Sequence, residues 1–159
     1  MLQIRRATVD DVPLLAAMIR ELAEFERESE FCVIRESDLA RDGFGKVPLF
    51  DAFIAEWNTA AAGYAVFFEC YSTWVGPELY LEDLYVRPQF RGQGIGISLL
   101  RAVARKAIEE KKVSMRWEVL NWNERAIKLY ESLGAELRRQ WRSVILTEEP
   151  LRHLAERRG

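Results

Sequence analysis

The segment Arg91–Gly96 reads RGQGIG and lies between an expected strand and an expected helix. Glycine lets the backbone turn tightly and leaves successive N–H groups uncovered. At the start of a helix, with the helix dipole behind them, such N–H groups bind a phosphate or pyrophosphate. Arg91 could add a charge-assisted hydrogen bond to the same anion. The segment therefore predicts an anion-binding loop, although a flexible turn with helix-capping glycines would carry the same letters.

Two better-known nucleotide motifs fit this loop less well. A dinucleotide fingerprint has the spacing Gly-x-Gly-x-x-Gly after the first strand of a βαβ unit. Here the spacing is Gly-x-Gly-x-Gly, and it follows a fourth expected strand. A P-loop requires Gly-Lys-Ser/Thr, and the segment contains no lysine. Glycine spacing alone therefore disfavours a dinucleotide-dependent oxidoreductase.

The second group of residues that could do chemistry is the acidic pair Glu82 and Asp83, which interrupts an apolar strand. Successive side chains of a strand point to opposite faces unless a bulge intervenes, so we expect different roles for the two carboxylates. A carboxylate can bind an ammonium group and accept its proton, directly or through water. Because the flanking residues are apolar, the pair indicates an amine site rather than two acids at a solvated strand end.

The elements expected to position these residues follow a mixed order. Strands are expected at 2–6, 49–57, 63–71, 79–86, 113–120 and 141–146, and helices at about 9–26, 37–41, 95–111, 123–133 and 148–158. This order predicts an α+β protein with a mixed, mostly antiparallel central sheet flanked by helices, not a doubly wound fold. The helical periodicity predicts inward positions for Leu99, Leu100, Val103, Ala107 and Ile108, and then for Ala126, Ile127, Tyr130 and Leu133.

Composition bounds the class of protein further. A chain of 159 residues with 49% hydrophobic residues can bury one core, and no linker interrupts it, so we expect a single domain over 1–159. The 23 Lys and Arg nearly balance the 25 Asp and Glu, which argues against nucleic acid and anionic membranes as partners. Neither a signal-peptide core nor an apolar run of the ~18 residues that span a bilayer is present. The two cysteines, Cys32 and Cys70, are expected to be reduced, buried thiols, which fits a cytoplasmic protein without a metal site.

Two motifs carry a family resemblance. Val86–Gly96, which reads VRPQFRGQGIG, closely resembles the acetyl-CoA pyrophosphate loop of the GNAT N-acetyltransferase superfamily. Asn121–Ala135, which reads NWNERAIKLYESLGA, resembles the second signature of that superfamily, Asn-x-x-A-x-x-x-Y-x-x-x-G. Their separation is also typical of the superfamily.

Four shorter segments narrow the resemblance. Residues 20–26, 42–45, 71–74 and 80–83 are similar to the diamine (spermidine/spermine) N-acetyltransferase subfamily, and 71–74 and 121–133 look most like its thialysine-acetylating branch. The likeness runs from residue 4 to about 147, and the segment between Gly134 and Trp141 is shorter than in the family. Ser72 stands where the polyamine-preferring branch carries an acid, which favours a shorter amine or an amino-acid analogue.

The resemblance implies a GNAT fold, acetyl-CoA as co-substrate, a homodimer and acetyl transfer to a small cationic amine. It also implies that Glu82 is the general base, that Tyr130 is the general acid for the CoA sulfur, and that Asp83 binds the cation or has a structural role. The residues that it places at acetyl-CoA are Leu84, Tyr85, Val86, Arg91, Gly92, Gln93, Gly94, Ile95, Gly96, Ile97, Asn123, Ala126 and Tyr130. On the substrate side it places Phe25, Glu26, Trp74, Glu82 and Asp83.

Other interpretations of these residues stay open at this point. From the residues alone, Tyr130 is a core residue. For Phe25 and Trp74, packing in the core and lining a substrate site are equally good explanations. His153, the only histidine, is expected to face solvent. The alternative functions are an acetyltransferase acting on a protein lysine or N-terminus and a non-catalytic acetyl-CoA-binding module.

Overall fold

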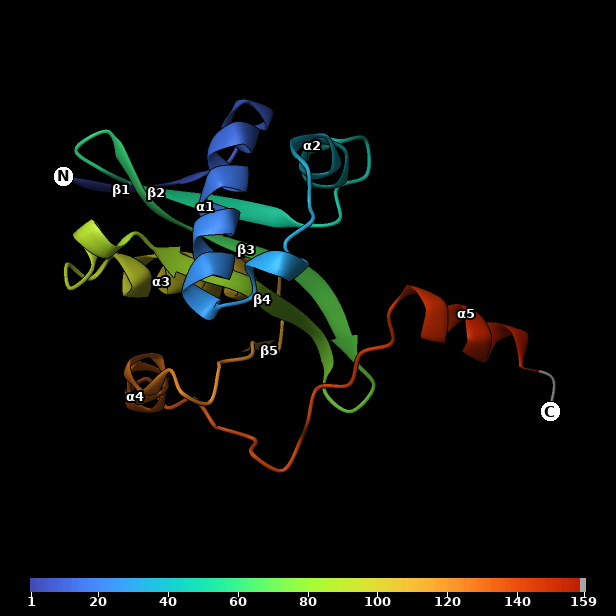
Figure 1. Cartoon of the computed structure of the whole chain (residues 1–159). Helices are drawn as coiled ribbons and strands as arrows, with labels where there is room; N and C mark the ends of the chain where they lie inside the picture. Colours follow the sequence, from blue (N-terminus) through green and yellow to red (C-terminus); the bar gives the residue numbers. More distant parts are fainter. Residues whose placement is uncertain (158–159) are drawn as a thin grey trace. The chain divides into compact units, whose positions relative to one another are not determined.

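The computed structural model describes residues 1–157 (Figure 1). Residues Met1–Leu120 form one compact unit, and a second unit begins at Asn121. The single domain expected over 1–159 stays a prediction. The last position of the helix expected at 148–158 lies outside the described residues, and the helix itself, α5, spans Glu148–Glu156.

The first unit contains a five-stranded sheet in the order β1-β2-β3-β4-β5. Its strands are β1 (Leu2–Arg6), β2 (Asp51–Trp57), β3 (Ala60–Ser72), β4 (Gly76–Val86) and β5 (Ser114–Arg116). Neighbouring strands are antiparallel from β1 to β4, whereas β4 and β5 are parallel. The expected mixed, mostly antiparallel sheet is confirmed.

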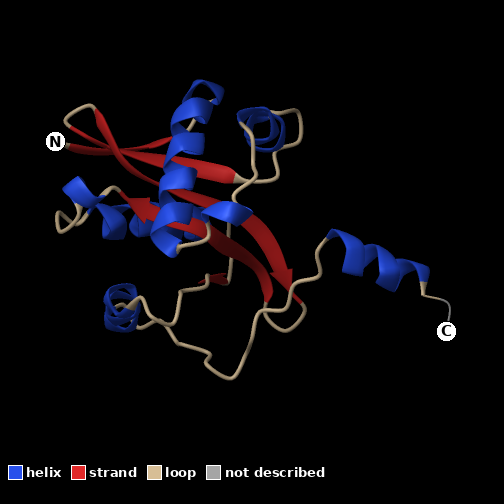
Figure 2. Ribbon diagram, in the orientation of Figure 1, coloured by secondary structure: helices blue, strands red, loops and turns tan. Residues whose placement is uncertain are grey.

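Helices cover both faces of this sheet (Figure 2). On one face, α1 (Val12–Glu26) buries Leu15 and Met18 against a cluster from β2, β3 and β4 that includes Tyr64. The opposite face is covered by α3 (Ile95–Glu109), which buries Leu99, Leu100, Val103 and Ala107. Ile108, which was expected to point inward as well, is 76% exposed, because it falls in the last turn of α3.

The sequence offers Thr8 as the N-cap of the first helix, with Asp11 three residues later. Thr8 and Asp11 form a capping box around a short 3-10 helix, η1 (Val9–Asp11), and the Thr8 N–H donates to Asp11 Oδ2 over 2.8 Å. Arg5 donates from Nη1 and Nη2 to the two Asp11 oxygens, each over 2.7 Å. These hydrogen bonds are the main reason why the pKa of Asp11 falls to about 2. Strand β1 and the start of α1 are thus held together by one carboxylate.

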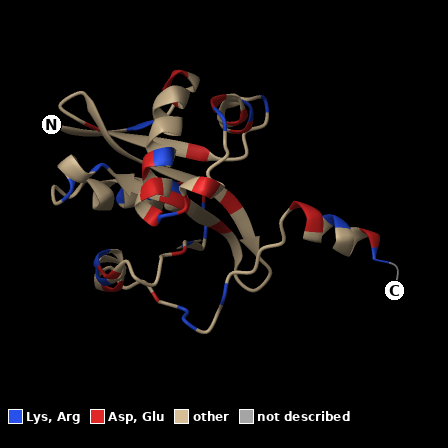
Figure 3. Cartoon of the chain, viewed as in Figure 1, with Lys and Arg blue, Asp and Glu red and all other residues tan. Residues whose placement is uncertain are grey.

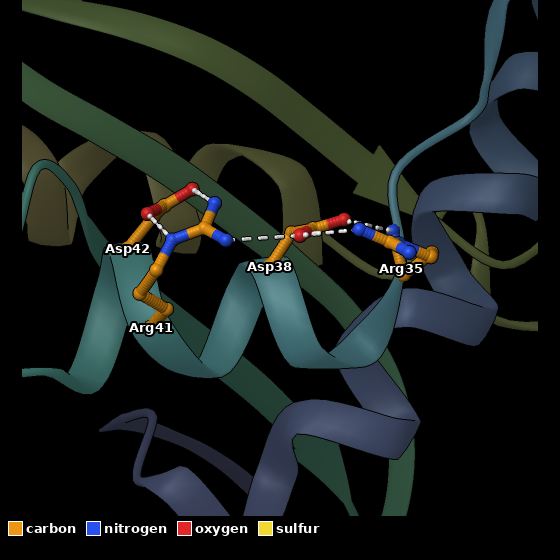
Figure 4. A network of polar contacts seen from close by, with 4 residues as sticks. All are labelled: Arg35, Asp38, Arg41 and Asp42. Atoms are coloured by element: carbon orange, nitrogen blue, oxygen red, sulfur yellow. Dashed lines mark hydrogen bonds and ion pairs between the residues drawn. The ribbon is translucent and has the colours of Figure 1, made fainter.

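The second helix is longer than the sequence predicts. α2 spans Glu36–Phe44, so it continues three residues beyond the end of the helix expected at about 37–41. Side-chain contacts run along it: Arg35 Nε donates to Asp38 over 3.0 Å, and Arg41 donates to Asp38 over 3.1 Å and to Asp42 over 2.7 Å (Figure 4). These contacts are at the surface and contribute little stability. Phe50 packs onto Gly43 within this helix and leaves no room for a Cβ, which would lie 2.3 Å from Phe50 Cζ.

Two expected strands differ from the structure. Only Ser114–Arg116 of 113–120 is a strand, and its pairing with β4 ends at Tyr80, two residues before an irregularity that bends β4. Within the described chain, 141–146 pairs with no other segment and forms no strand. Its last three residues are all apolar, so it lacks the clean alternation that fixes a strand to one buried face.

The second unit contains α4 (Glu124–Ser132) and α5. Asn123, a residue type that the sequence offers as an N-cap, caps α4, since its Oδ1 accepts a hydrogen bond from the Ala126 N–H over 3.3 Å. Gly134 follows the helix with a φ of 82°, the left-handed conformation that ends helices. Leu133, which was expected to point inward, is 47% exposed at the C-cap.

Candidate active site

Glu82 occupies a β-bulge in β4. Asp83 pairs with Val66 and Leu81 pairs with the next residue, Phe67, so Glu82 has no partner on β3. A bulge adds one residue to a strand, bends it and interrupts the alternation of side chains. The bulge therefore interrupts the alternation on which the expectation of opposite faces for Glu82 and Asp83 depends. Their carboxylates are close enough for the charge of Glu82 to raise the pKa of Asp83.

Asp83 is held by a buried tyrosine. The Tyr64 hydroxyl donates to Asp83 Oδ2 over 2.9 Å, and the Tyr64 side chain is fully buried. Burial raises the pKa of Asp83 to about 6, in spite of this hydrogen bond, and the charges of Glu82 and Glu26 act in the same direction as burial. Tyr64 is not among the site residues expected from the sequence. The available signal was a tyrosine within an apolar strand, because a buried hydroxyl needs a partner.

The carboxylates of Glu26 and Glu118 extend this acidic region beyond Glu82 and Asp83. Glu82 is exposed, yet partial desolvation raises its pKa, and the charge of Glu118 raises it further. Partial burial also raises the pKa of Glu26, at the end of α1, and the charge of Glu28 adds to this effect. Figure 3 shows acidic positions gathered on the C-terminal half of α1 and on the neighbouring strands. A cation complements such a region, and a carboxylate with a raised pKa is a better proton acceptor near neutral pH.

The glycine loop has the geometry of an anion cradle. Gly92 and Gly94 have φ values of 81° and 74°, and a Cβ at Gly92 would meet no atom within 4 Å. The Ser98 N–H donates to the Gly94 carbonyl over 3.0 Å, so the N–H groups of 95–97 precede the first hydrogen bond of α3. These N–H groups lie at the positive end of the α3 dipole.

The strand that leads to the loop has an open edge. Pairing between β4 and β5 stops at Tyr80, whereas β4 continues to pair with β3 through Val86. Leu84, Tyr85 and Val86 therefore lie beyond the end of the β5 ladder, where an extended ligand can hydrogen-bond with the backbone.

Arg91 does not extend freely from the loop. Its Nε donates to the Val86 carbonyl over 2.8 Å. Its guanidinium carbon lies 4.8 Å from the centre of the Phe25 ring and 5.8 Å from that of Tyr85. Phe25 is 37% exposed, so it is neither a core residue nor fully solvated. The contact brings together the end of α1 and the start of the glycine loop, which were expected to serve different ligands.

Trp74 is not brought to the acidic pair of its own chain. It lies in the turn between β3 and β4 and is 84% exposed, which excludes core packing for it in this chain. Glu82 lies farther along β4, roughly 20 Å from the turn at ~3.3 Å per residue. A small amine cannot span that distance.

The remaining expected site residues belong to the second unit. Asn123 and Ala126 form the cap of α4, and Tyr130 lies on the same helix. Tyr130 is buried, and this burial raises the pKa of its phenol. The hydroxyl is therefore protonated at neutral pH and can donate a hydrogen bond. His153 is exposed on α5, as expected.

Burial of Asp83 gives the folding stability a particular pH dependence. Its pKa rises from the ordinary 3.8 to about 6, so its contribution to the free energy of unfolding is full below pH 3.8 and is lost as the pH rises through 6. Asp83→Asn stays neutral and keeps an oxygen for Tyr64. It should raise the free energy of unfolding relative to wild type at about pH 8, by up to about 3 kcal/mol, and much less at about pH 4.

Denaturant unfolding of both proteins at the two pH values measures this difference. Asp10→Asn, at an exposed position, is the matched control for the replacement of one aspartate by asparagine. A difference between Asp83→Asn and wild type that stays constant with pH would mean that Asp83 is ionised at no cost in the folded protein.

The described residues contain neither a cluster of three or more His, Cys, Asp or Glu side chains suited to a metal ion nor a helix long and apolar enough to cross a membrane. Cys32 and Cys70 are free thiols and are partly exposed rather than buried. The reason is their position: Cys32 lies in the loop after α1, and Cys70 lies near the end of β3.

The first unit is an antiparallel meander that continues through a glycine-rich loop into a helix and a parallel strand. The chain belongs to the acetyltransferase (GNAT) family, whose profile matches residues 15–135. It is 40% identical to thialysine N-epsilon-acetyltransferase of Mus musculus, over 98% of each chain. It is 42% identical to the enzyme of the same name from Caenorhabditis elegans, over 82% of this chain and 81% of the relative.

A solved structure agrees with this assignment. An integron cassette protein from the mobile metagenome of V. cholerae superimposes with a TM-score of 0.80 over 98% of both chains, at 24% identity. This likeness shows the fold, and the family membership shows that the chain is an N-acetyltransferase.

Proposed function

We propose that the chain transfers the acetyl group of acetyl-CoA to the side-chain amine of a small basic amino acid of the thialysine type. The observation that carries the proposal is the acidic pair at the β4 bulge, on the same strand that leads into the glycine loop. Family membership supports the acetyl transfer, and the thialysine-acetylating relatives support this kind of substrate. Ser72 stands where the resemblance places an acid in the polyamine-preferring branch, which favours a short substrate over a long polyamine.

The residues present fit acetyl-CoA. The open space above Gly92 and the N–H groups at the start of α3 suit its pyrophosphate. The edge of β4 at 84–86, which lies beyond the β5 ladder and where Arg91 takes up the Val86 carbonyl, suits an extended pantetheine arm. When bound, acetyl-CoA supplies an activated thioester.

The roles of the chain's own residues follow from their chemistry. A free alkylamine has a pKa near ~10.4 and arrives protonated. The carboxylates of Asp83 and Glu26 attract this ammonium group, and Glu82 accepts its proton, directly or through water. The Tyr130 hydroxyl donates a proton to the leaving sulfur. These roles are proposals that rest on the family resemblance together with the environment of each group.

Gly94→Ala tests the loop. The new methyl group would meet Ile97 Cγ2 at 3.9 Å, an ordinary contact, so the main cost to folding is the left-handed φ of 74°. That cost is roughly 1–2 kcal/mol. Because the methyl group also covers the adjacent N–H groups, the dissociation constant of acetyl-CoA should rise about 10-fold or more, the equivalent of one or two weakened charge-assisted hydrogen bonds.

Gly134→Ala is the matched control, measured alongside it by titration calorimetry. Gly134 has a φ of 82°, and a Cβ added there would meet no atom within 4 Å, so its replacement carries the same backbone strain outside the loop. Equal acetyl-CoA affinity in the two variants would mean that the glycine loop does not bind acetyl-CoA.

The proposed function is tested by CoA release from acetyl-CoA with thialysine, lysine, ornithine, a diamine, spermidine and a lysine-containing peptide. We expect the highest kcat/KM with thialysine or another short basic amino acid. Faster turnover of the peptide would indicate a protein acetyltransferase. Acetyl-CoA binding without turnover on any amine would indicate a binding module.

We further propose that the protein is a cytoplasmic homodimer. Tyr71 and Trp74 at the β3–β4 hairpin are 70% and 84% exposed, an apolar surface that a second copy could cover. The two free thiols fit a reducing compartment. Sedimentation equilibrium tests the dimer directly.

A further inference from the structure

The structure points to a role for Arg91 that differs from that of an anion ligand. Its guanidinium is engaged in three directions, by the Val86 carbonyl and by the rings of Phe25 and Tyr85. An arginine that binds a phosphate presents its planar fork of N–H groups to the anion. Here the guanidinium carbon lies over the Phe25 ring, and the Nε–H already donates to the Val86 carbonyl.

A second set of contacts fixes the helix that carries Phe25. Arg87 Nη2 donates to Glu21 Oε1 over 2.7 Å, and Arg87 Nη1 donates to the Ala61 carbonyl over 3.0 Å. Tyr85 also interacts with Glu21, and the charge of Glu21 helps to raise the pKa of the Tyr85 phenol, after the larger effect of burial. Glu21 lies about one helical turn before Phe25. The ion pair therefore holds α1 beside the end of β4, and Arg91 contacts the Phe25 ring at the end of the same helix.

We propose that Arg91 is a positioning residue that couples the glycine loop to the amine-binding side of the site. Its guanidinium holds the Phe25 ring, and with it the end of α1 at Glu26, against the residue that opens the loop. Acetyl-CoA binds the backbone N–H groups of the loop. Ordering the loop then orders Phe25 and Glu26, so that acetyl-CoA and the amine bind with positive cooperativity, and each strengthens the other by the same factor. This inference rests on the proposed function.

The experiment measures binding and turnover separately. Titration calorimetry gives the dissociation constant of acetyl-CoA, and the dissociation constant of thialysine is measured with and without CoA, the product, so that no reaction occurs. In wild type, CoA should tighten thialysine binding about fivefold, the equivalent of one cation–π contact of ~1 kcal/mol. In Arg91→Gln this factor should fall towards one and the thialysine KM should rise about fivefold, whereas the acetyl-CoA dissociation constant changes less than about twofold.

Three variants separate positioning from other roles. Arg91→Lys keeps the charge but loses the planar face, so it should not restore the coupling, whereas a phosphate ligand would tolerate lysine. Phe25→Leu should lose the coupling to the same extent, and adding Arg91→Gln to it should have no further effect. Arg101→Gln, at an exposed position of α3, is the matched control and should leave both dissociation constants unchanged.

Two results would overturn the inference. One is a rise of about 10-fold in the acetyl-CoA dissociation constant of Arg91→Gln that Arg91→Lys restores, because that result makes the guanidinium an anion ligand. The other is unchanged coupling in Phe25→Leu. Failure of the proposed function is distinguishable, since wild type would then turn over none of the amines.

Discussion

Glu82→Gln is expected to lower kcat/KM for the amine about 10²- to 10⁴-fold at neutral pH, the range of a lost general base. Glutamine preserves the size of the side chain at the bulge but cannot accept a proton. Because Glu82 lies on β4, before the glycine loop, the dissociation constant of acetyl-CoA should change little. Steady-state kinetics with thialysine and calorimetry with acetyl-CoA measure the two effects.

The pH profile distinguishes a base from a structural acid. Desolvation and Glu118 raise the pKa of Glu82 above its ordinary 4.5, so the wild-type rate should fall as the pH drops through that raised value. In Glu82→Gln this limb should be absent, and the deficit should shrink as the pH approaches ~10.4, where the amine loses its own proton. Glu109→Gln, at an exposed position of α3, is the control. Wild-type turnover in Glu82→Gln at neutral pH would refute the role.

The sequence predicted those parts of the site that need particular local residues. The glycine loop could be predicted from the sequence because a left-handed φ at Gly92 and Gly94 favours glycine at those positions. The caps of α1 and α4 could also be predicted, because the hydrogen bonds of Thr8, Asp11 and Asn123 join residues only three positions apart in the sequence. In each case the structure depends on a short stretch of chain.

The sequence did not predict the parts that depend on partners distant in the chain. Whether Glu82 and Asp83 face apart depends on the register of β3 against β4, and that register shifts between Val66 and Phe67. The Tyr64–Asp83 hydrogen bond joins residues on neighbouring strands, just to one side of this shift. Arg91 and Phe25 meet only because α1 packs on the face of the sheet where β4 ends. Periodicity carries none of this information, since it describes one element at a time.

The prediction of a strand at 141–146 was wrong for a related reason. A strand is defined by its ladder, and the segment has no ladder partner in the described part of the chain. Its side chains are all exposed, including Trp141 and Val144 at 65% and 89%. Trp74 is exposed as well, so the core of one copy does not explain the position of every apolar residue in this chain. This exposure is the reason to test the proposed homodimer.

Tyr130→Phe is expected to lower kcat at least about 100-fold, the lower range of a lost general acid. A CoA thiolate is the leaving group, and a thiol of ordinary pKa near ~8.5 leaves more readily when it is protonated as the C–S bond breaks. Burial raises the pKa of Tyr130, so the phenol holds its proton throughout the neutral range and the variant loses only the hydroxyl. Phenylalanine keeps the buried ring, so folding and acetyl-CoA affinity should be nearly unchanged.

The size of the loss separates catalysis from packing. If Tyr130 served only the interior of its unit, removal of the hydroxyl would change the free energy of unfolding by about 1 kcal/mol and leave kcat intact. Tyr71→Phe, at a tyrosine that is 70% exposed, is the matched control and should retain wild-type kcat. Single-turnover measurements of CoA release in all three proteins report the chemical step itself. If CoA release is slow in Tyr130→Phe alone and its stability is retained, Tyr130 on α4 is the proton donor. If all three proteins release CoA at the same rate, Tyr130 serves only in packing.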